Sequence, residues 1–182
     1  MAAVALDIEK YQFQPTDELL FDANIWFFLY GPNRPSHPKV AIYSAAYKRI
    51  AAANNRVYID VLVLSEFVNR YARLRHNLII GQRGVPKDFK QFRSTSFFKS
   101  IARDIAADVR QILGNCTPVE SGFANLDLDT LTTVYAAGNS DFNDLILAEL
   151  CQSKGFKLVT DDGDFKNNNI TLLTANPKLL TP

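Results

Sequence analysis

Hydrophobic residues follow two kinds of pattern along this 182-residue chain. Short apolar runs bounded by polar or turn residues predict buried strands, and apolar residues spaced three or four apart predict helices. The expected strands are 19–21, 56–60, 156–160 and 170–174. The expected helices are 40–53, 64–74, 98–112 and 140–153. Ser140 is expected to cap the last of these helices, and Gly155 to stop it.

Strands that alternate with helices predict an α/β fold, Rossmann-like, with three layers and a mostly parallel central sheet between helices. The length fits one domain over 1–182, and 47% hydrophobic residues with 13 Phe suffice for a substantial core. Three segments are less regular: we interpret 24–29 as a turn or helix and 33–38 as a loop, and 116–139 shows no clear pattern.

Carboxylates follow the strands of this expected sheet. Asp22 comes directly after the strand 19–21, and Asp162 and Asp164 lie in the turn that follows 156–160. In such folds, ligands bind beyond the carboxyl ends of the strands. The sequence therefore predicts that these acids lie at the edge of the sheet where ligands bind.

Two helices add further acids. The helix that begins after Ser140 runs into the strand 156–160, so its first turn, with Asp141 and Asp144, lies at the same edge. Glu66 lies off the apolar stripe of its own helix and shares a face with Arg70. Each acid alone has an ordinary explanation, such as a helix terminus, a turn or a surface ion pair.

Together these acids would repel one another, and a hard divalent cation removes that repulsion. Oxygen-only ligands suit Mg²⁺ or Mn²⁺. The chemistry typical of such a site is the attack of an activated water on phosphorus. The expected catalytic and metal-binding residues are Asp22, Glu66, Asp144 and Asp162, with Asp141 and Asp164 as further candidate ligands.

Charge is unevenly distributed, although the net charge is only +1. Residues 70–103 carry nine Lys or Arg and one acid, whereas 104–182 carry five basic and eleven acidic residues. A basic segment beside an acidic one suits an enzyme that binds a polyanion, and a solvated helical face is the alternative. We expect RNA to lie over 70–103, with contacts from Arg70, Arg73, Lys99 and Arg103.

Four motifs resemble those of PIN-domain ribonucleases. They appear in the family's order over about 19–174, and they are Leu20-Phe-Asp-Ala-Asn24, Leu64-Ser-Glu-Phe-Val-Asn69, Asn143-Asp-Leu-Ile-Leu-Ala148 and Leu158-Val-Thr-Asp-Asp-Gly-Asp-Phe165. The resemblance implies a PIN-type fold, a divalent metal and RNA cleavage. By position, Asp22, Glu66, Asp144 and Asp162 match the family's acids. Asn24 and Thr160 match its supporting polar residues.

The chain also resembles the toxin subunits of VapBC toxin–antitoxin pairs. That resemblance implies an antitoxin protein and a second copy of the chain, in a homodimer, as partners. The segment between Arg70 and Leu126 is longer than in compact toxins, and we interpret 70–125 as a helical basic insertion. The toxin role and the dimer therefore remain open at this point.

Two other functions are open alternatives. A PIN-like domain without catalysis would bind RNA or a protein partner and would bind metal weakly or not at all. A receiver domain or a haloacid-dehalogenase phosphatase would place its acidic pair after the first strand, where Asp22-Ala23-Asn24 supplies one carboxylate. The phosphate-binding GxxxxGK[ST] pattern is absent from the sequence.

The remaining features favour a cytoplasmic protein. Cys116 and Cys151 have no ligand-like spacing, and we interpret them as free thiols. We interpret His37 and His76 as loop or surface residues. The N-terminus lacks the basic region of a signal peptide, and no apolar run reaches the ~18 residues that span a membrane.

Overall fold

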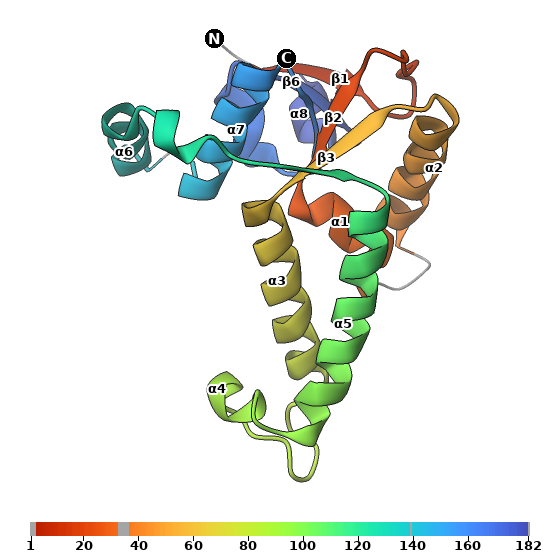
Figure 1. Cartoon of the computed structure of the whole chain (residues 1–182), viewed down its shortest axis with the longest axis vertical. Coiled ribbons are helices and arrows are strands. Elements are labelled where there is room, and N and C mark those ends of the chain that lie inside the picture. The colour runs from red at the N-terminus through yellow and green to blue at the C-terminus, as the bar shows by residue number, and fades with distance from the viewer. Residues whose placement is uncertain (1–2, 33–36, 139, 182) are drawn as a thin grey trace.

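A parallel sheet of six strands organises the part of the chain that this computed structural model describes, residues 3–32, 37–138 and 140–181 (Figure 1). In spatial order the strands are β1 (Val4–Asp7), β6 (Thr171–Thr174), β5 (Lys157–Val159), β2 (Glu18–Phe21), β3 (Arg56–Asp60) and β4 (Thr117–Val119). Every neighbouring pair is parallel. The predicted α/β fold with a parallel central sheet is confirmed. Most of the predicted loop 33–38 lies outside the described residues.

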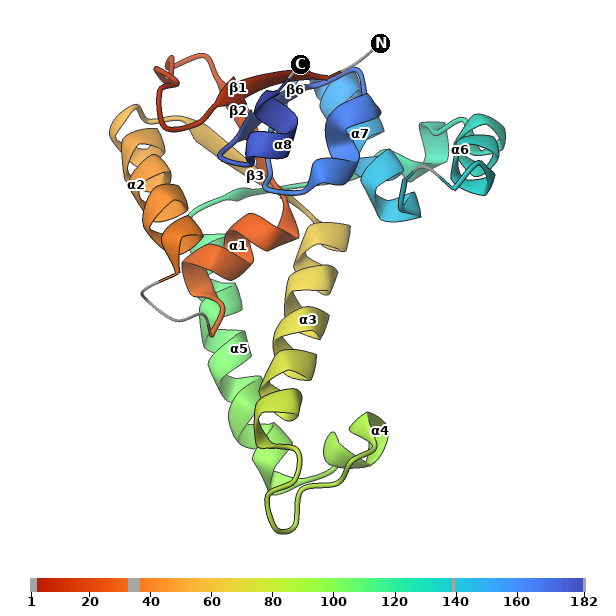
Figure 2. The same cartoon turned by 180° about the vertical axis from the view of Figure 1, so that it is seen from behind.

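The helices cover both faces of this sheet, as Figures 1 and 2 show for α7 on one side and α2 on the other. They are α1 (Ala23–Tyr30), α2 (Pro38–Ala52), α3 (Val61–Ile79), α4 (Phe89–Phe92), α5 (Ser96–Gly114), α6 (Leu128–Ala136), α7 (Phe142–Lys154) and α8 (Pro177–Leu180). Short 3-10 turns are η1 (Phe123–Asn125) and η2 (Gly163–Asn167). Because both faces are covered, the central strand β2 buries consecutive residues, Leu19, Leu20 and Phe21.

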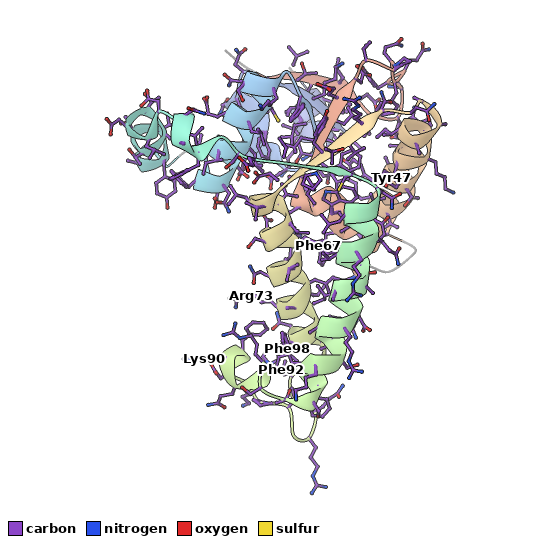
Figure 3. All side chains as sticks on the ribbon, in the orientation of Figure 1. Tyr47, Phe67, Arg73, Lys90, Phe92 and Phe98 are labelled. Carbon is purple, nitrogen blue, oxygen red and sulfur yellow. The ribbon has the colours of Figure 1, made fainter. Side chains whose placement is uncertain are left out.

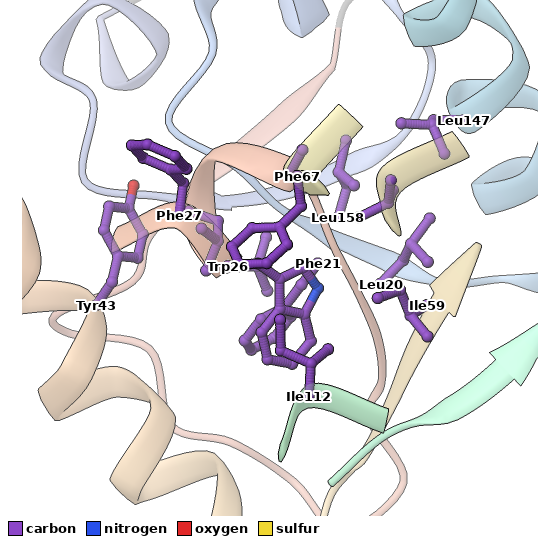
Figure 4. Packing of buried hydrophobic residues seen from close by; sticks show 14 of the residues in the cluster. Leu20, Phe21, Trp26, Phe27, Tyr43, Ile59, Phe67, Ile112, Leu147 and Leu158 are labelled. Atoms are coloured by element: carbon purple, nitrogen blue, oxygen red, sulfur yellow. The ribbon is translucent and has the colours of Figure 1, made fainter. Parts of the chain in front are cut away.

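The core joins the sheet to helices that are distant in sequence. Phe21 and Trp26 pack with their ring centroids 5.0 Å apart. Figure 4 shows Phe67 of α3 and Ile112 of α5 on either side of this pair, all of them fully buried. Buried side chains near the start of α1 and in the second turn of α3 therefore anchor these helices to the core.

Helices α3 and α5 lie side by side and extend away from the sheet, with α4 near their far end (Figures 1 and 2). His76 of α3 is buried there, its ring stacked 4.3 Å from Phe92 and its Nε2 2.8 Å from the carbonyl oxygen of Pro86. Our expectation of a surface histidine was wrong, because the chain folds back over α3 after Gly81. The interpretation of 70–125 as an insertion stays a prediction.

Several element boundaries differ from the sequence-based expectations. The strand β1 was not anticipated, and the unassigned segment 116–139 contains β4, η1 and α6. Asp141, rather than Ser140, caps α7, because its Oδ1 accepts a hydrogen bond from the Asn143 amide at 2.9 Å. His37 similarly caps α2, accepting from the Lys39 amide at 3.3 Å.

Both cysteines are free thiols, as expected; Cys151 is buried and Cys116 is half-buried. Within residues 3–32, 37–138 and 140–181, no helix has the length and apolar character needed to cross a membrane.

The end of α7 offers a test of the fold. Gly155 caps this helix at φ +72°, a conformation that an L side chain adopts only with strain. Gly155→Ala should lower the free energy of unfolding by ~1 kcal/mol, measured by urea denaturation. The matched control is Gly114→Ala, in helical backbone with open space around the added methyl, which should stabilise by up to ~1 kcal/mol. Equal effects at both positions would contradict the left-handed cap.

Candidate active site

Asp22 is a buried carboxylate at the carboxyl end of the central strand. It is 5% exposed, caps α1, and accepts a hydrogen bond from the Ala23 amide. Its Oδ2 also accepts from the hydroxyl of Thr160, at 2.7 Å, and from the side-chain amide of Asn24. Thr160 follows β5, the neighbour of β2, so strand pairing places the two residues side by side.

Asn24 and Thr160 also hold the next turn of the chain. The Thr160 hydroxyl accepts from the Asp162 amide at 3.0 Å, and Oδ1 of Asn24 accepts from the Asp161 amide at 3.2 Å. One polar network thus fixes Asp22 and the backbone that carries Asp162. The role of both polar residues in supporting a metal site stays a prediction.

Asp144 lies in the first turn of α7 and is half-buried. Burial, followed by the charges of Asp22, Asp162, Asp141 and Glu66, raises the pKa of Asp144 to about 8. Burial also raises the pKa of Asp22 to about 6, with Glu66 and Asp162 adding to the effect against the hydrogen bond from Thr160. The four acids that the sequence pointed to therefore interact electrostatically at one edge of the sheet.

Glu66 reaches this group from α3, whose first turn is capped by the buried Asp60. Partial burial raises the pKa of Glu66, and Asp141 and Asp162 act in the same direction, while Arg70 lowers it. Among the described residues, Glu66 and Arg70 form no ion pair within 4 Å. The guanidinium of Arg70 instead lies 4.8 Å from the centroid of the Phe27 ring.

The two further candidate ligands, Asp141 and Asp164, are exposed, as are Glu66 and Asp162. Asp141 caps α7, and Asp164 lies in η2, where its amide donates to Oδ1 of Asp162 at 3.1 Å. Asp141 contributes to the raised pKa values of Glu66 and Asp144, which places its charge near theirs. Asp164 does not contribute to the raised pKa of either group.

Helix α2 contributes two residues that the sequence analysis missed, Lys39 and Tyr43. The Lys39 ammonium and the Tyr43 hydroxyl each donate to Oδ1 of Asp161 at 2.8 Å. Asn176 donates to the carbonyl oxygen of Asp161 at 2.7 Å. The carboxylate of Asp161 is thus directed at α2, and this contact holds the turn that presents Asp162. No local sequence pattern signals a contact that spans more than a hundred residues.

The donor set suits a hard cation, since every candidate ligand is a carboxylate oxygen and their mutual repulsion needs compensation. Among residues 3–32, 37–138 and 140–181, however, no three His, Cys, Asp or Glu side chains are close enough to hold a metal ion together as they stand.

A groove of about 620 Å³ extends from this acidic group along α3. Phe27 and Leu62 contribute to its floor. Its polar lining residues are Ser65, Glu66, Asn69, Arg70, Arg73, Asn77 and Asn143. We call it the α3 groove. Arg70 and Arg73 thus share a groove with Glu66, whereas Lys99 and Arg103, on α5, are not among its lining residues.

Comparison with known proteins agrees with this architecture. A family model described as "PIN domain" matches residues 19–170. The fold is similar to a chain in the crystal structure of VapBC2 from Rickettsia felis bound to a DNA fragment from their promoter, with a TM-score of 0.53 and 16% sequence identity over 86% of this chain and 97% of that chain. At this identity the likeness concerns the fold. No curated protein matched the sequence.

The raised pKa of Asp144 predicts how stability depends on pH in the absence of divalent metal. Between its usual value of 3.8 and about 8, the folded protein holds a proton that the unfolded chain has released. Stability in EDTA should therefore fall as the pH rises from about 4 to about 8. Asp144→Asn removes this charge, so the melting temperature at pH 8 should rise by ~2–4 °C for each kcal/mol of repulsion relieved.

The measurement is thermal unfolding in EDTA at pH 5 and pH 8. At pH 5 the advantage of Asp144→Asn over the parent should shrink. Glu149→Gln, an exposed position on the same helix, serves as the control and should leave the pH dependence unchanged. An Asp144→Asn protein that is less stable than the parent at pH 8 would contradict the repulsion.

Proposed function

This chain belongs to the PIN-domain family, and on that premise we propose that it is a divalent-metal-dependent endoribonuclease, a hydrolase acting on RNA phosphodiesters. The observation that carries the proposal is the cluster of four carboxylates at the carboxyl edge of the sheet. Burial and their shared charge raise the pKa of Asp144 to about 8. Perturbed carboxylates beside an open groove are typical of a functional site.

The residues that would hold Mg²⁺ or Mn²⁺ are Asp22, Glu66, Asp144 and Asp162, with Asp141 and Asp164 as further ligands, direct or through water. When bound, such an ion supplies positive charge that activates a water and stabilises the attacking and leaving oxygens at phosphorus. The fit rests on the all-oxygen donor set and on the repulsion between its members.

The chain itself supplies position and charge. Asn24 and Thr160 keep the buried Asp22 carboxylate in one orientation through the bonds to its Oδ2. Thr160 also fixes the turn that carries Asp162, because its hydroxyl accepts a hydrogen bond from the Asp162 amide. Arg70 and Arg73, which line the α3 groove beside Glu66, are the proposed contacts to RNA phosphates, because the acids alone would repel the substrate. Lys99 and Arg103, which the sequence also suggested as RNA contacts, do not line this groove.

The similarity to a VapBC structure supports a finer proposal. We propose that the chain acts in the cytoplasm as the toxin of a toxin–antitoxin pair, with an antitoxin protein and a second copy of the chain as partners. The competing function is a PIN-like domain that binds RNA or protein without cutting. The raised pKa of Asp144 favours the enzyme, because uncompensated repulsion in a metal-free binding domain would cost stability without benefit.

Cleavage tests this function directly. Purified protein with Mg²⁺ or Mn²⁺ should cut total RNA, and sequencing of the products locates the cuts. Asp144→Asn should lower the rate by ~100-fold or more, because it removes a ligand whose charge is worth several kcal/mol in the transition state. Asparagine keeps the volume of the side chain, so the fold should persist.

The control variant is again Glu149→Gln, which should cut at the parental rate. Cutting that continues in excess EDTA would exclude metal-dependent chemistry. If Asp144→Asn stopped cutting RNA but still bound Mn²⁺ as tightly as the parent, Asp144 would not be a metal ligand.

A further inference from the structure

We propose that the α3 groove binds a single strand of RNA next to the cut, with Arg70 and Arg73 as its two phosphate contacts. This inference rests on the proposed function and specifies its substrate path. The groove begins at Glu66 and Asn143, beside the acidic cluster, and continues to Asn77. At 1.5 Å per residue, Glu66 to Asn77 corresponds to ~16 Å along the helix axis, room for a few nucleotides.

The two arginines are held in place by aromatic rings rather than by acids. Arg70 lies 4.8 Å from the centroid of Phe27, and Arg73 lies 4.9 Å from that of Phe89, on α4. Among the described residues, neither arginine lies within 4 Å of a carboxylate, whereas Arg75 of the same helix pairs with Asp104 at 3.5 Å. A stacked guanidinium keeps its N–H edge available for phosphate oxygens.

The far end of the groove gains further positive charge from α4. Arg93 approaches the same Phe89 ring at 6.0 Å from its centroid. Figure 3 shows Arg73 on the flank of α3 near α4, where Lys90 also projects. Charge therefore changes along the groove, from Glu66 beside the acidic site to Arg70 and Arg73 further along α3. Lys90 and Arg93 add positive charge beside its distal end. A polyanion would be held there while its proximal phosphate reaches the acids.

The rest of the polar lining is neutral. Ser65, Asn69, Asn77 and Asn143 offer hydroxyl and amide groups that both donate and accept hydrogen bonds. Such groups match the edges of unpaired bases, which a duplex would hide. These features favour a single strand over a duplex.

Lys99 and Arg103 provide the matched comparison. Both are exposed on α5, and they carry the same charge as Arg70 and Arg73 without lining the α3 groove. If binding depended only on the net charge of 70–103, both pairs would contribute equally to RNA affinity. If RNA lies in the α3 groove, only Arg70 and Arg73 will contribute to that affinity.

The experiment measures the binding of a labelled RNA strand of about 12 nucleotides by fluorescence anisotropy across a salt series. Every protein carries Asp144→Asn to prevent cutting. Arg70→Ala with Arg73→Ala should weaken binding at least ~10-fold and reduce the slope of log K against log salt by roughly 1.4, or 0.7 for each phosphate contact. Lys99→Ala with Arg103→Ala should change affinity by less than ~3-fold, since neither contacts the strand in the groove. A duplex of the same sequence should bind more weakly than the strand.

Equal losses in the two double variants, or a duplex bound as tightly as the strand, would overturn the groove as the path. Thermal unfolding of each double variant verifies that the fold is intact. These results distinguish a failure of the proposed groove from a failure of the proposed nuclease activity. A parent protein that cuts RNA while the Arg70 and Arg73 variant binds normally refutes only the groove. Groove-dependent binding by a parent that never cuts refutes only the nuclease.

Discussion

The parallel pairing of β2 with β5 is the constraint on which the site depends. It sets Asp22, at the end of one strand, beside Thr160, at the end of the other, and the 2.7 Å hydrogen bond between them follows. The turn after Thr160 then carries Asp162 to the same place, and α7, which precedes β5, delivers Asp144 from its first turn. Burial, followed by the charges of these neighbouring carboxylates, raises the pKa of Asp144 to about 8. We propose that a divalent cation relieves the repulsion between them.

A second constraint comes from helices that leave the sheet. Asp60 ends β3 and caps α3, so the helix begins at the acidic edge and carries Glu66 on its second turn, followed by Arg70 and Arg73. The groove therefore links acidic and basic functions along a single rigid element. Aromatic rings from α1 and α4 fix the two arginines, which costs less conformational entropy at binding than ordering free side chains would.

Strand and helix periodicity predicted four of the six strands, β2, β3, β5 and β6, and with them the convergence of the acids, because residues that end parallel strands must share an edge. The contacts of Lys39 and Tyr43 with Asp161 could not be predicted, since they depend on how α2 packs across the sheet. The burial of His76 likewise depends on the return of the chain over α3 to Pro86 and Phe92. Strand β4 has three residues including a proline, which are too few for an alternating hydrophobic pattern to be recognised in the sequence.

We propose that the raised pKa values of Asp22, Glu66 and Asp144 reflect a site prepared for a divalent cation. Calorimetric titration of Mn²⁺ at pH 7, in two buffers that differ in ionisation enthalpy, measures binding and proton release together. We expect binding with release of about one proton, because Asp144 with its pKa of about 8 must lose its proton to become a ligand. Asp144→Asn should abolish that release. Binding of Mn²⁺ with no proton released by the parent, or no binding at all, would contradict the proposal.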